Sequence, residues 1–263
     1  MSVPIKTPED IEGMRHVGRK TAEILDFITP HVVPGVTTAE LDALCHSFIV
    51  DTQKGIAINV GYGPKNNPFP KTICTSVNHV VCHGIPSDKK LKDGDILNID
   101  VAMVINGYHG DTSRMFYIGK PSIAGKRLTE ATYAAMWRGI RAVKPGARLG
   151  DIGHAIQSYV EPMGFSVVRD FCGHGIGKVY HDEPQVTHYG KPGTGMILLP
   201  GMMFTIEPMI NIGKFGVRIL ADGWTAVTAD HSLSAQWEHT VLVTETGYEV
   251  TTLSDGSPPP SLI

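Results

Sequence analysis

Residues 91–100 read LKDGDILNID, and residues 198–207 repeat the pattern as LLPGMMFTIE. With the glycines aligned, each copy runs from a turn into an apolar segment and ends on a carboxylate, Asp100 or Glu207. A short apolar run bounded by turn residues is typical of a buried strand. The repeat therefore predicts two related halves, each of which offers an acid at the same position of a strand.

Helices are expected before both copies. A Pro-Gly turn precedes helical patterns over residues 38–50 and 149–160, and a further amphipathic helix is expected over residues 8–27. The matching order of turn, helix and strand supports the internal repeat.

The chain of 263 residues is long enough for one large domain or two small ones, and we expect one domain over residues 1–263. Its halves span about residues 1–120 and 140–250, and they are joined near residues 120–145. The Pro- and Ser-rich tail, residues 254–263, is expected to be disordered.

Composition narrows the class of protein. Hydrophobic residues make up 42% and charged residues 19%, as in folded globular proteins. The net charge of −3 favours neither nucleic acid nor a membrane surface as a partner. No apolar run approaches the ~20 residues of a membrane span, and the N-terminus has no signal-peptide core. We therefore expect a cytoplasmic protein, and its four cysteines need not pair in that reducing compartment.

A hairpin brings two acids together. Asn106-Gly107 is a strong two-residue turn signal, and with this turn Asp100 faces Ser113 across the strands. Asp100 and Asp111 then project from one face as diagonal neighbours. They could instead be exposed surface acids, but the apolar residues around them favour a buried sheet, where paired acids require a cation.

The second half supplies matching groups. Glu207 ends one apolar segment and Glu238 lies inside another, and both segments are nearly free of the basic residues that an ion pair would need. His174 stands between glycines that let the backbone approach a ligand, although a lone histidine is more often structural. Four carboxylates and one imidazole suit a pair of divalent cations better than a single zinc ion.

These motifs resemble those of the type I methionine aminopeptidases, in the short bacterial form, over essentially the whole chain. The segments that carry the resemblance are IKTPEDIEGMR at 5–15, SVNHVVCHGIP at 76–86, LNIDV at 97–101, GYHGDTSRMF at 107–116, VVRDFCGHGIGKVYHDEPQV at 167–186, FTIEPM at 204–209, DGWT at 222–225 and SAQWEHTVLVT at 234–244.

The resemblance implies an α+β pita-bread fold, with two pseudo-symmetric halves, a curved antiparallel sheet and flanking helices. It implies removal of the initiator methionine from nascent proteins when the second residue is small. The expected cofactors are two divalent ions of Co, Mn, Fe, Ni or Zn. The expected partners are nascent chain N-termini and the ribosome, with the enzyme itself a monomer.

Site residues carry over from the family motif by motif. The metal ligands would be Asp100, Asp111, His174, Glu207 and Glu238, with Asp100 and Glu238 as bridges. The methionine pocket would be lined by Tyr62, Phe69, Cys74, Tyr180 and Trp224. Residues 63–68 form a longer loop than is usual in the family. The sequence therefore does not fix the register of Tyr62 and Phe69 at the pocket rim.

The same resemblance implies a mechanism. Glu207 would act as general base and proton shuttle. His181 would stabilise the developing oxyanion, and His83 would contact the leaving nitrogen. Both histidines would also bind substrate.

Two other functions fit parts of the pattern. A proline-specific peptidase of the same fold would usually carry a further N-terminal domain. A non-catalytic module that holds nascent chains or ribosomes would be expected to have lost metal ligands, whereas all five are present here.

Overall fold

The computed structural model describes residues 3–260. The first half contains α1 (Pro8–Ile28), α2 (Thr38–Ser47), β1 (Ile56–Ala57), β2 (Ile73–Val77), β3 (Val80–Cys82), β4 (Ile96–Ile105) and β5 (Tyr108–Tyr117). The second half contains α3 (Ile123–Arg141), α4 (Leu149–Val160), β6 (Ser166–Val167), β7 (Gly173–Gly175), β8 (Asp182–Val186), β9 (Met203–Ile206), β10 (Met209–Asn211), β11 (Val217–Ile219), β12 (Ala226–Thr228), β13 (Ser234–Gln236), β14 (His239–Val243) and β15 (Tyr248–Val250).

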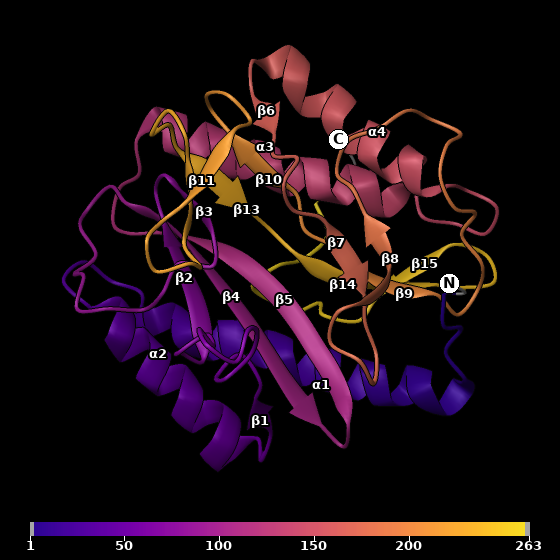
Figure 1. The fold of residues 1–263 in the computed structure, drawn as a ribbon, viewed down its shortest axis with the longest axis horizontal. Helices are drawn as coiled ribbons and strands as arrows, with labels where there is room; N and C mark the ends of the chain where they lie inside the picture. Colours follow the sequence, from indigo (N-terminus) through magenta and orange to yellow (C-terminus); the bar gives the residue numbers. More distant parts are fainter. Residues whose placement is uncertain (1–2, 261–263) are drawn as a thin grey trace.

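The strands lie between two pairs of helices. In Figure 1, α1 and α2 run along one side of the molecule and α3 and α4 along the opposite side. One apolar core fills the space beneath α1 and α2, and another fills the space beneath α3 and α4. Each helix pair therefore packs on a core of its own, and the strands that form the shared site lie between the two cores.

Equivalent backbone hydrogen bonds form at the two Pro-Gly turns. Gly35 donates its N–H to the carbonyl of Leu91 at 2.7 Å, and Gly146 donates to the carbonyl of Leu198 at 3.0 Å. Both glycines have positive φ, 93° and 84°, a conformation that side chains disfavour. The Pro-Gly turns thus tie the start of α2 and of α4 to the repeated segments in the same way.

A helix occupies the stretch near residues 120–145 that we expected to join the halves. Helix α3 begins after Ser122, whose Oγ accepts the N–H of Gly125 at 3.0 Å. The sequence analysis missed it because no Pro-Gly turn precedes it, as one precedes residues 38–50 and 149–160. Much of its buried face is glycine, alanine and threonine. One of these small residues is needed, since a Cβ on Gly139 would lie 2.8 Å from Ile156 of α4. The second half therefore begins with α3, the counterpart of α1.

The β4–β5 hairpin has the predicted register. Asn106 and Gly107 form its loop with φ of 52° and 80°. Asp100 pairs with Ser113, which leaves Asp100 and Asp111 as diagonal neighbours on one face. Helix α1 packs closely on the hairpin at Gly110, where a Cβ would clash with α1.

The two halves meet edge to edge at Ser113 and Glu238. These residues exchange backbone hydrogen bonds of 3.3 and 3.4 Å, so β5 of the first half runs beside β14 of the second. Thr240 reinforces the seam by donating its hydroxyl to the carbonyl of Asp111 at 2.8 Å. The seam places the acids of the two halves next to one another.

The tail contains no helix or strand over residues 254–260, yet it makes specific contacts where we expected disorder. The buried guanidinium of Arg114 donates to the Ser254 hydroxyl at 2.7 Å, and Arg141 donates to the carbonyl of Pro260 at 2.9 Å. Tyr133 of α3 donates to the carbonyl of Pro258. Residues 261–263 of the predicted tail lie outside the described residues.

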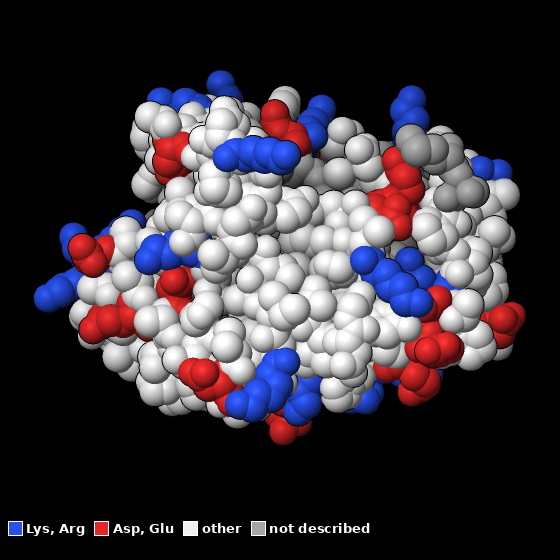
Figure 2. Space-filling model, turned by 60° about the horizontal axis from the view of Figure 1, so that its bottom comes forward, with Lys and Arg blue, Asp and Glu red and all other residues white. Residues whose placement is uncertain are grey.

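Surface charge is mixed on the face in Figure 2. Lysine and arginine alternate with aspartate and glutamate around a broad uncharged area. Among residues 3–260, no helix is long and apolar enough to cross a membrane.

Candidate active site

A cavity of about 580 Å³ lies between the two halves. It has the size of a small-molecule or peptide-end pocket. All the residues that the sequence predicted for the site line it: Tyr62, Phe69, Cys74, His83, Asp100, Asp111, His174, Tyr180, His181, Glu207, Trp224 and Glu238. The tertiary structure thus gathers segments from residue 62 to residue 238 around one space.

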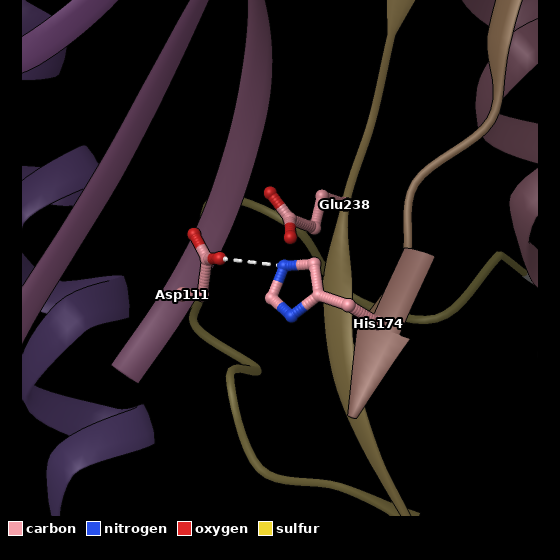
Figure 3. Close-up of side chains that lie close together, drawn as sticks. All are labelled: Asp111, His174 and Glu238. Atoms are coloured by element: carbon pink, nitrogen blue, oxygen red, sulfur yellow. Dashed lines mark ion pairs between the residues drawn. The ribbon is translucent and has the colours of Figure 1, made fainter. Parts of the chain in front are cut away.

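Three side chains meet at the centre of the cavity. Asp111 on β5, His174 on β7 and Glu238 beside β14 point toward one another in Figure 3. One ligand atom from each lies within 4.8 Å of the other two. Glu207 is close to them, with its Oε1 3.7 Å from Nε2 of His174. Each half of the chain therefore contributes acids to one cluster.

His174 is held in one orientation. Its Nδ1 lies 3.1 Å from the carbonyl oxygen of Gly175, which makes Nδ1 the protonated nitrogen of the neutral ring. Its Nε2 lies 3.4 Å from Oδ2 of Asp111. Burial opposes the charged ring, but the hydrogen bond to Asp111 and the charge of Glu207 raise its pKa to about 9. Nε2 is therefore the nitrogen that faces the acids, and in the metal-free protein it carries a proton at neutral pH.

The four carboxyl groups are too crowded to be ionised together without a cation. Burial, followed by the charges of neighbouring acids, raises the pKa of Asp100 and of Glu238 well above the usual range. Burial likewise raises the pKa of Asp111, and it raises that of Glu207 to about 7. Oδ1 of Asp111 is buried and has no hydrogen-bonding partner among the described residues. This oxygen-rich donor set, with one imidazole, fits divalent metal ions.

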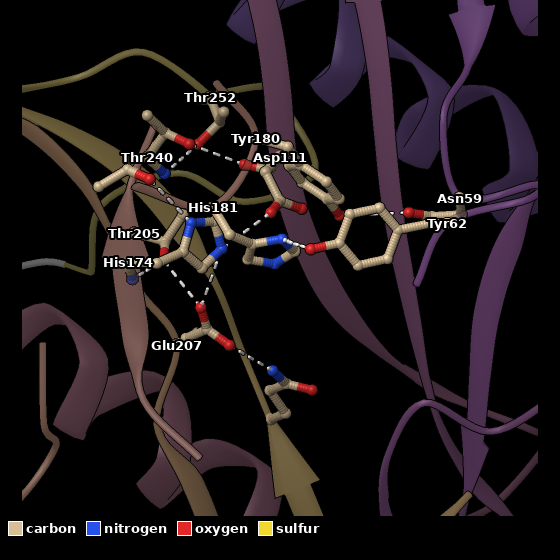
Figure 4. Close-up of polar contacts among 12 residues, drawn as sticks. Asn59, Tyr62, Asp111, His174, Tyr180, His181, Thr205, Glu207, Thr240 and Thr252 are labelled. Carbon is tan, nitrogen blue, oxygen red and sulfur yellow. Dashed lines mark hydrogen bonds and ion pairs between the residues drawn. The ribbon is translucent and has the colours of Figure 1, made fainter. Parts of the chain in front are cut away.

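Glu207 is fixed by three groups that the sequence analysis missed. Thr205 donates its hydroxyl to Oε1 at 2.7 Å (Figure 4). Gln236 donates its amide to Oε2 at 3.3 Å. The backbone N–H of Glu207 donates to Nε2 of His188, a buried ring that is 1% exposed. Thr205 also accepts the N–H of His174 at 2.9 Å, so one hydroxyl aligns two of the predicted ligands.

Thr205 could have been found from the sequence, because it lies two residues before Glu207 and residues two apart in a strand share a face. The same spacing relates Gln236 to Glu238, but it gives no signal for His188. His188 reaches Glu207 only through the packing of a separate segment.

The two predicted substrate histidines both line the cavity. The ring of His181 lies 4.1 Å from the ring of His174 and contacts the hydroxyl of Tyr62 (Figure 4). His83 has a positive φ of 56° and packs edge-on against Phe171, with 5.4 Å between ring centroids. Burial lowers the pKa of both histidines, that of His181 to about 3, so both rings are neutral at pH 7.

The long loop over residues 63–68 leaves the pocket rim intact. Gly61 donates its N–H to the carbonyl of Phe69 at 2.9 Å, and Phe69 donates to the carbonyl of Tyr62 at 2.8 Å. The extra residues bulge outward from this clasp, so Tyr62 and Phe69 both face the cavity. Trp224 closes the wall by donating its indole N–H to the carbonyl of Asn67 at 3.0 Å.

Comparison with a family pattern gives the class of protein. The pattern described as metallopeptidase family M24 matches residues 12–245. Solved structures of lower identity share the fold: the prolidase from Pyrococcus furiosus superposes with a TM-score of 0.75 at 23% identity, over 95% of this chain and 66% of that chain.

More similar relatives give the particular family. The methionine aminopeptidase of Escherichia coli K12 is 53% identical over 264 residues, covering 100% of this chain and 98% of that protein. That of Rickettsia prowazekii is 55% identical over 97% of this chain and 96% of that protein. The crystal structure of methionine aminopeptidase from Rickettsia prowazekii superposes with a TM-score of 0.93, covering 96% of this chain and 100% of that chain. The chain therefore belongs to metallopeptidase family M24 and, within it, to the methionine aminopeptidases.

Membership confirms the fold class and the class of enzyme. The chain has the pita-bread fold of this family, and it is a hydrolase whose chemistry uses divalent metal. The roles of individual residues stay predictions.

The buried acids predict a pH dependence of stability in the metal-free protein. An unfolded glutamate titrates near 4.5, but the pKa of Glu207 in the folded protein is about 7. Between these values the folded state holds a proton that the unfolded state releases, so raising the pH favours unfolding. Glu207→Gln removes this effect. The free energy of unfolding of the variant, relative to wild type, should increase by up to roughly 1.4 kcal/mol per pH unit over this window.

Urea titrations of both metal-free proteins at pH 5, 6 and 7 measure the difference. Histidines remote from the cavity cancel in this comparison because both proteins contain them. A difference that stays constant with pH would show that Glu207 has an ordinary pKa in the fold.

Proposed function

We propose that this enzyme removes the initiator methionine from nascent proteins when the second residue is small. The observation that carries the proposal is that one cavity holds a cluster of acids and imidazole beside an aromatic pocket. Its relatives of more than 50% identity are named methionine aminopeptidases. The nascent N-terminus is the proposed partner, and the proposed site of action is the cytoplasm, at or near the ribosome, as a monomer.

The metal centre is proposed to hold two ions. Their ligands would be Asp100, Asp111, His174, Glu207 and Glu238, with Asp100 and Glu238 shared between the ions. Divalent ions in such a site polarise the scissile carbonyl and lower the pKa of the attacking water. Carboxylate-rich sites accept Co, Mn, Fe, Ni or Zn, and the supply of metal decides among them.

The protein's own residues would move the proton and stabilise charge. Glu207 accepts the proton of the attacking water and passes it to the leaving nitrogen, with its two oxygens oriented by Thr205 and Gln236. His181 donates a hydrogen bond to the oxygen that becomes negative in the transition state. His83, which also lines the cavity, contacts the leaving nitrogen.

The aromatic pocket suits a thioether side chain. Phe69 is 3% exposed and packs edge-on against Trp224, with 5.3 Å between ring centroids. Sulfur makes favourable contacts with ring edges, and an unbranched methionine side chain adapts to such walls. Cys74 and Tyr180 complete the lining.

A peptide panel tests the proposal. Metal-stripped enzyme should release free methionine from Met-Ala-Ser after Co, Mn, Fe, Ni or Zn is added singly, and should hold two ions per chain at saturation. Met-Lys-Ser, with a large second residue, should be cut far more slowly. Cleavage only of Xaa-Pro peptides would favour a proline-specific peptidase, and absence of stoichiometric metal binding would favour a non-catalytic module.

Single histidine variants test the assigned contacts. His181→Ala should lower kcat by about 10²-fold, the scale for removal of one donor to an oxyanion. His83→Ala should lower kcat/KM through loss of the contact at the leaving nitrogen. His154→Ala on α4 is the matched control and should leave both constants unchanged. Full activity of both cavity variants would make the two rings structural.

A further inference from the structure

Tyr62 and His181 meet across the cavity from opposite halves of the chain. The phenol oxygen of Tyr62, in the loop before β2, hydrogen-bonds Nδ1 of His181, which lies between β7 and β8 (Figure 4). Their ring centroids are 5.1 Å apart. The contact therefore links the methionine pocket to the residue proposed to stabilise the oxyanion.

The direction of this hydrogen bond decides what His181 can do. A neutral imidazole has one N–H, and the partner of one nitrogen sets the role of the other. A phenol keeps its proton at neutral pH, so Tyr62 can donate its O–H to Nδ1. Nε2 of His181 then carries the ring proton. Only this tautomer can donate a hydrogen bond from Nε2 to an oxyanion.

We propose that Tyr62 is a positioning residue, which holds His181 in the tautomer and orientation that present Nε2–H to the scissile carbonyl oxygen. The inference rests on the proposed function. It assigns Tyr62 a role beyond that of pocket wall, because the hydroxyl acts through His181 while the ring contacts the substrate side chain.

The fold holds the Tyr62 hydroxyl in place. The ring of Tyr62 packs edge-on against Tyr180, with 5.2 Å between centroids, and Tyr180 donates its own hydroxyl to Oδ1 of Asn59 at 3.2 Å. Phe69 donates its backbone N–H to the carbonyl of Tyr62, which closes the base of the loop. The ring of Tyr62 is thus held by Tyr180, and its backbone is held by Phe69.

The outer part of the same loop is tied to the other half. Asn67 donates its side-chain amide to the carbonyl of Asp222 at 3.0 Å, and it accepts the indole N–H of Trp224. Gly63 lies so near Trp224 that a Cβ there would be 2.4 Å from the indole. The longer loop thus anchors Tyr62 to the half of the chain that carries His181.

Tyr62→Phe tests the role, because it removes the hydroxyl and keeps the ring. We expect kcat on Met-Ala-Ser to fall about 5- to 10-fold, the scale for one lost orienting hydrogen bond, with KM changed less than about 2-fold. In a His181→Ala background the same substitution should have no further effect on kcat. Tyr159→Phe, on α4 beneath Arg138, is the matched control and should match wild type.

Nitrogen NMR of the metal-free protein gives a readout that does not depend on turnover. In wild type, Nδ1 of His181 should have the shift of an unprotonated nitrogen that accepts a hydrogen bond, and in Tyr62→Phe the ring should become a mixture of tautomers. Full kcat in Tyr62→Phe, an additive loss in the His181→Ala background, or protonated Nδ1 in wild type would each overturn the inference. Absence of methionine release by wild type would instead refute the proposed function.

Discussion

Glu207→Gln should lower kcat at least about 10²-fold, the usual scale for loss of a general base. Glutamine keeps the shape and can still meet Thr205 and Gln236, but its amide cannot accept a proton. Burial places the pKa of Glu207 at about 7 in the metal-free protein, so its carboxylate needs little driving force to exchange a proton near neutral pH. Steady-state release of methionine from Met-Ala-Ser, with metal at saturation, measures the effect.

Two controls separate chemistry from folding. Glu245→Gln, on the surface, should retain wild-type kcat. Thermal melting should show that metal-free Glu207→Gln is at least as stable as wild type at pH 7, because a crowded acid has been removed. A variant with near-normal kcat would refute Glu207 as the base.

Asp100→Asn should have opposite effects on the metal-free and metal-loaded proteins. Without metal, Asp100 is buried beside Asp111 and Glu207, and the folded state must either keep its proton or hold it next to like charges. The neutral amide removes that penalty, so the free energy of unfolding should increase by roughly 1 kcal/mol or more. With metal, the loss of a proposed bridging ligand should lower metal affinity and reduce activity at least about 10²-fold, as expected for a ligand at the reacting centre.

Metal-dependent stabilisation measures both effects in one experiment. Ligands stabilise only the folded state that binds them, so the rise of Tm on adding metal reports affinity. Wild type should show a large rise and Asp100→Asn a small one from a higher starting Tm. Asp88→Asn, in an exposed loop, should behave as wild type. Unchanged metal content and activity in Asp100→Asn would contradict the proposed dinuclear site.

Features encoded by neighbours in the sequence were predictable. The Asn106-Gly107 turn has few backbone solutions, so it fixed the register of β4 and β5 and the relation of Asp100 to Asp111. The repeated glycine turns likewise predicted the two halves. Helix α3 was missed although it is local, because no Pro-Gly turn marks its start as one does for α2 and α4.

The description of the site needed both the sequence and the tertiary structure. By itself, the sequence determined which residues were chemically out of place, such as Glu238 in an apolar strand, and the resemblance supplied their predicted roles. Only the tertiary structure decided which groups hold them: His188 behind Glu207, and the Tyr62 hydroxyl on His181. These contacts join segments 19 and 119 residues apart. The first depends on packing within the second half and the second on how the two halves meet, and local pattern encodes neither.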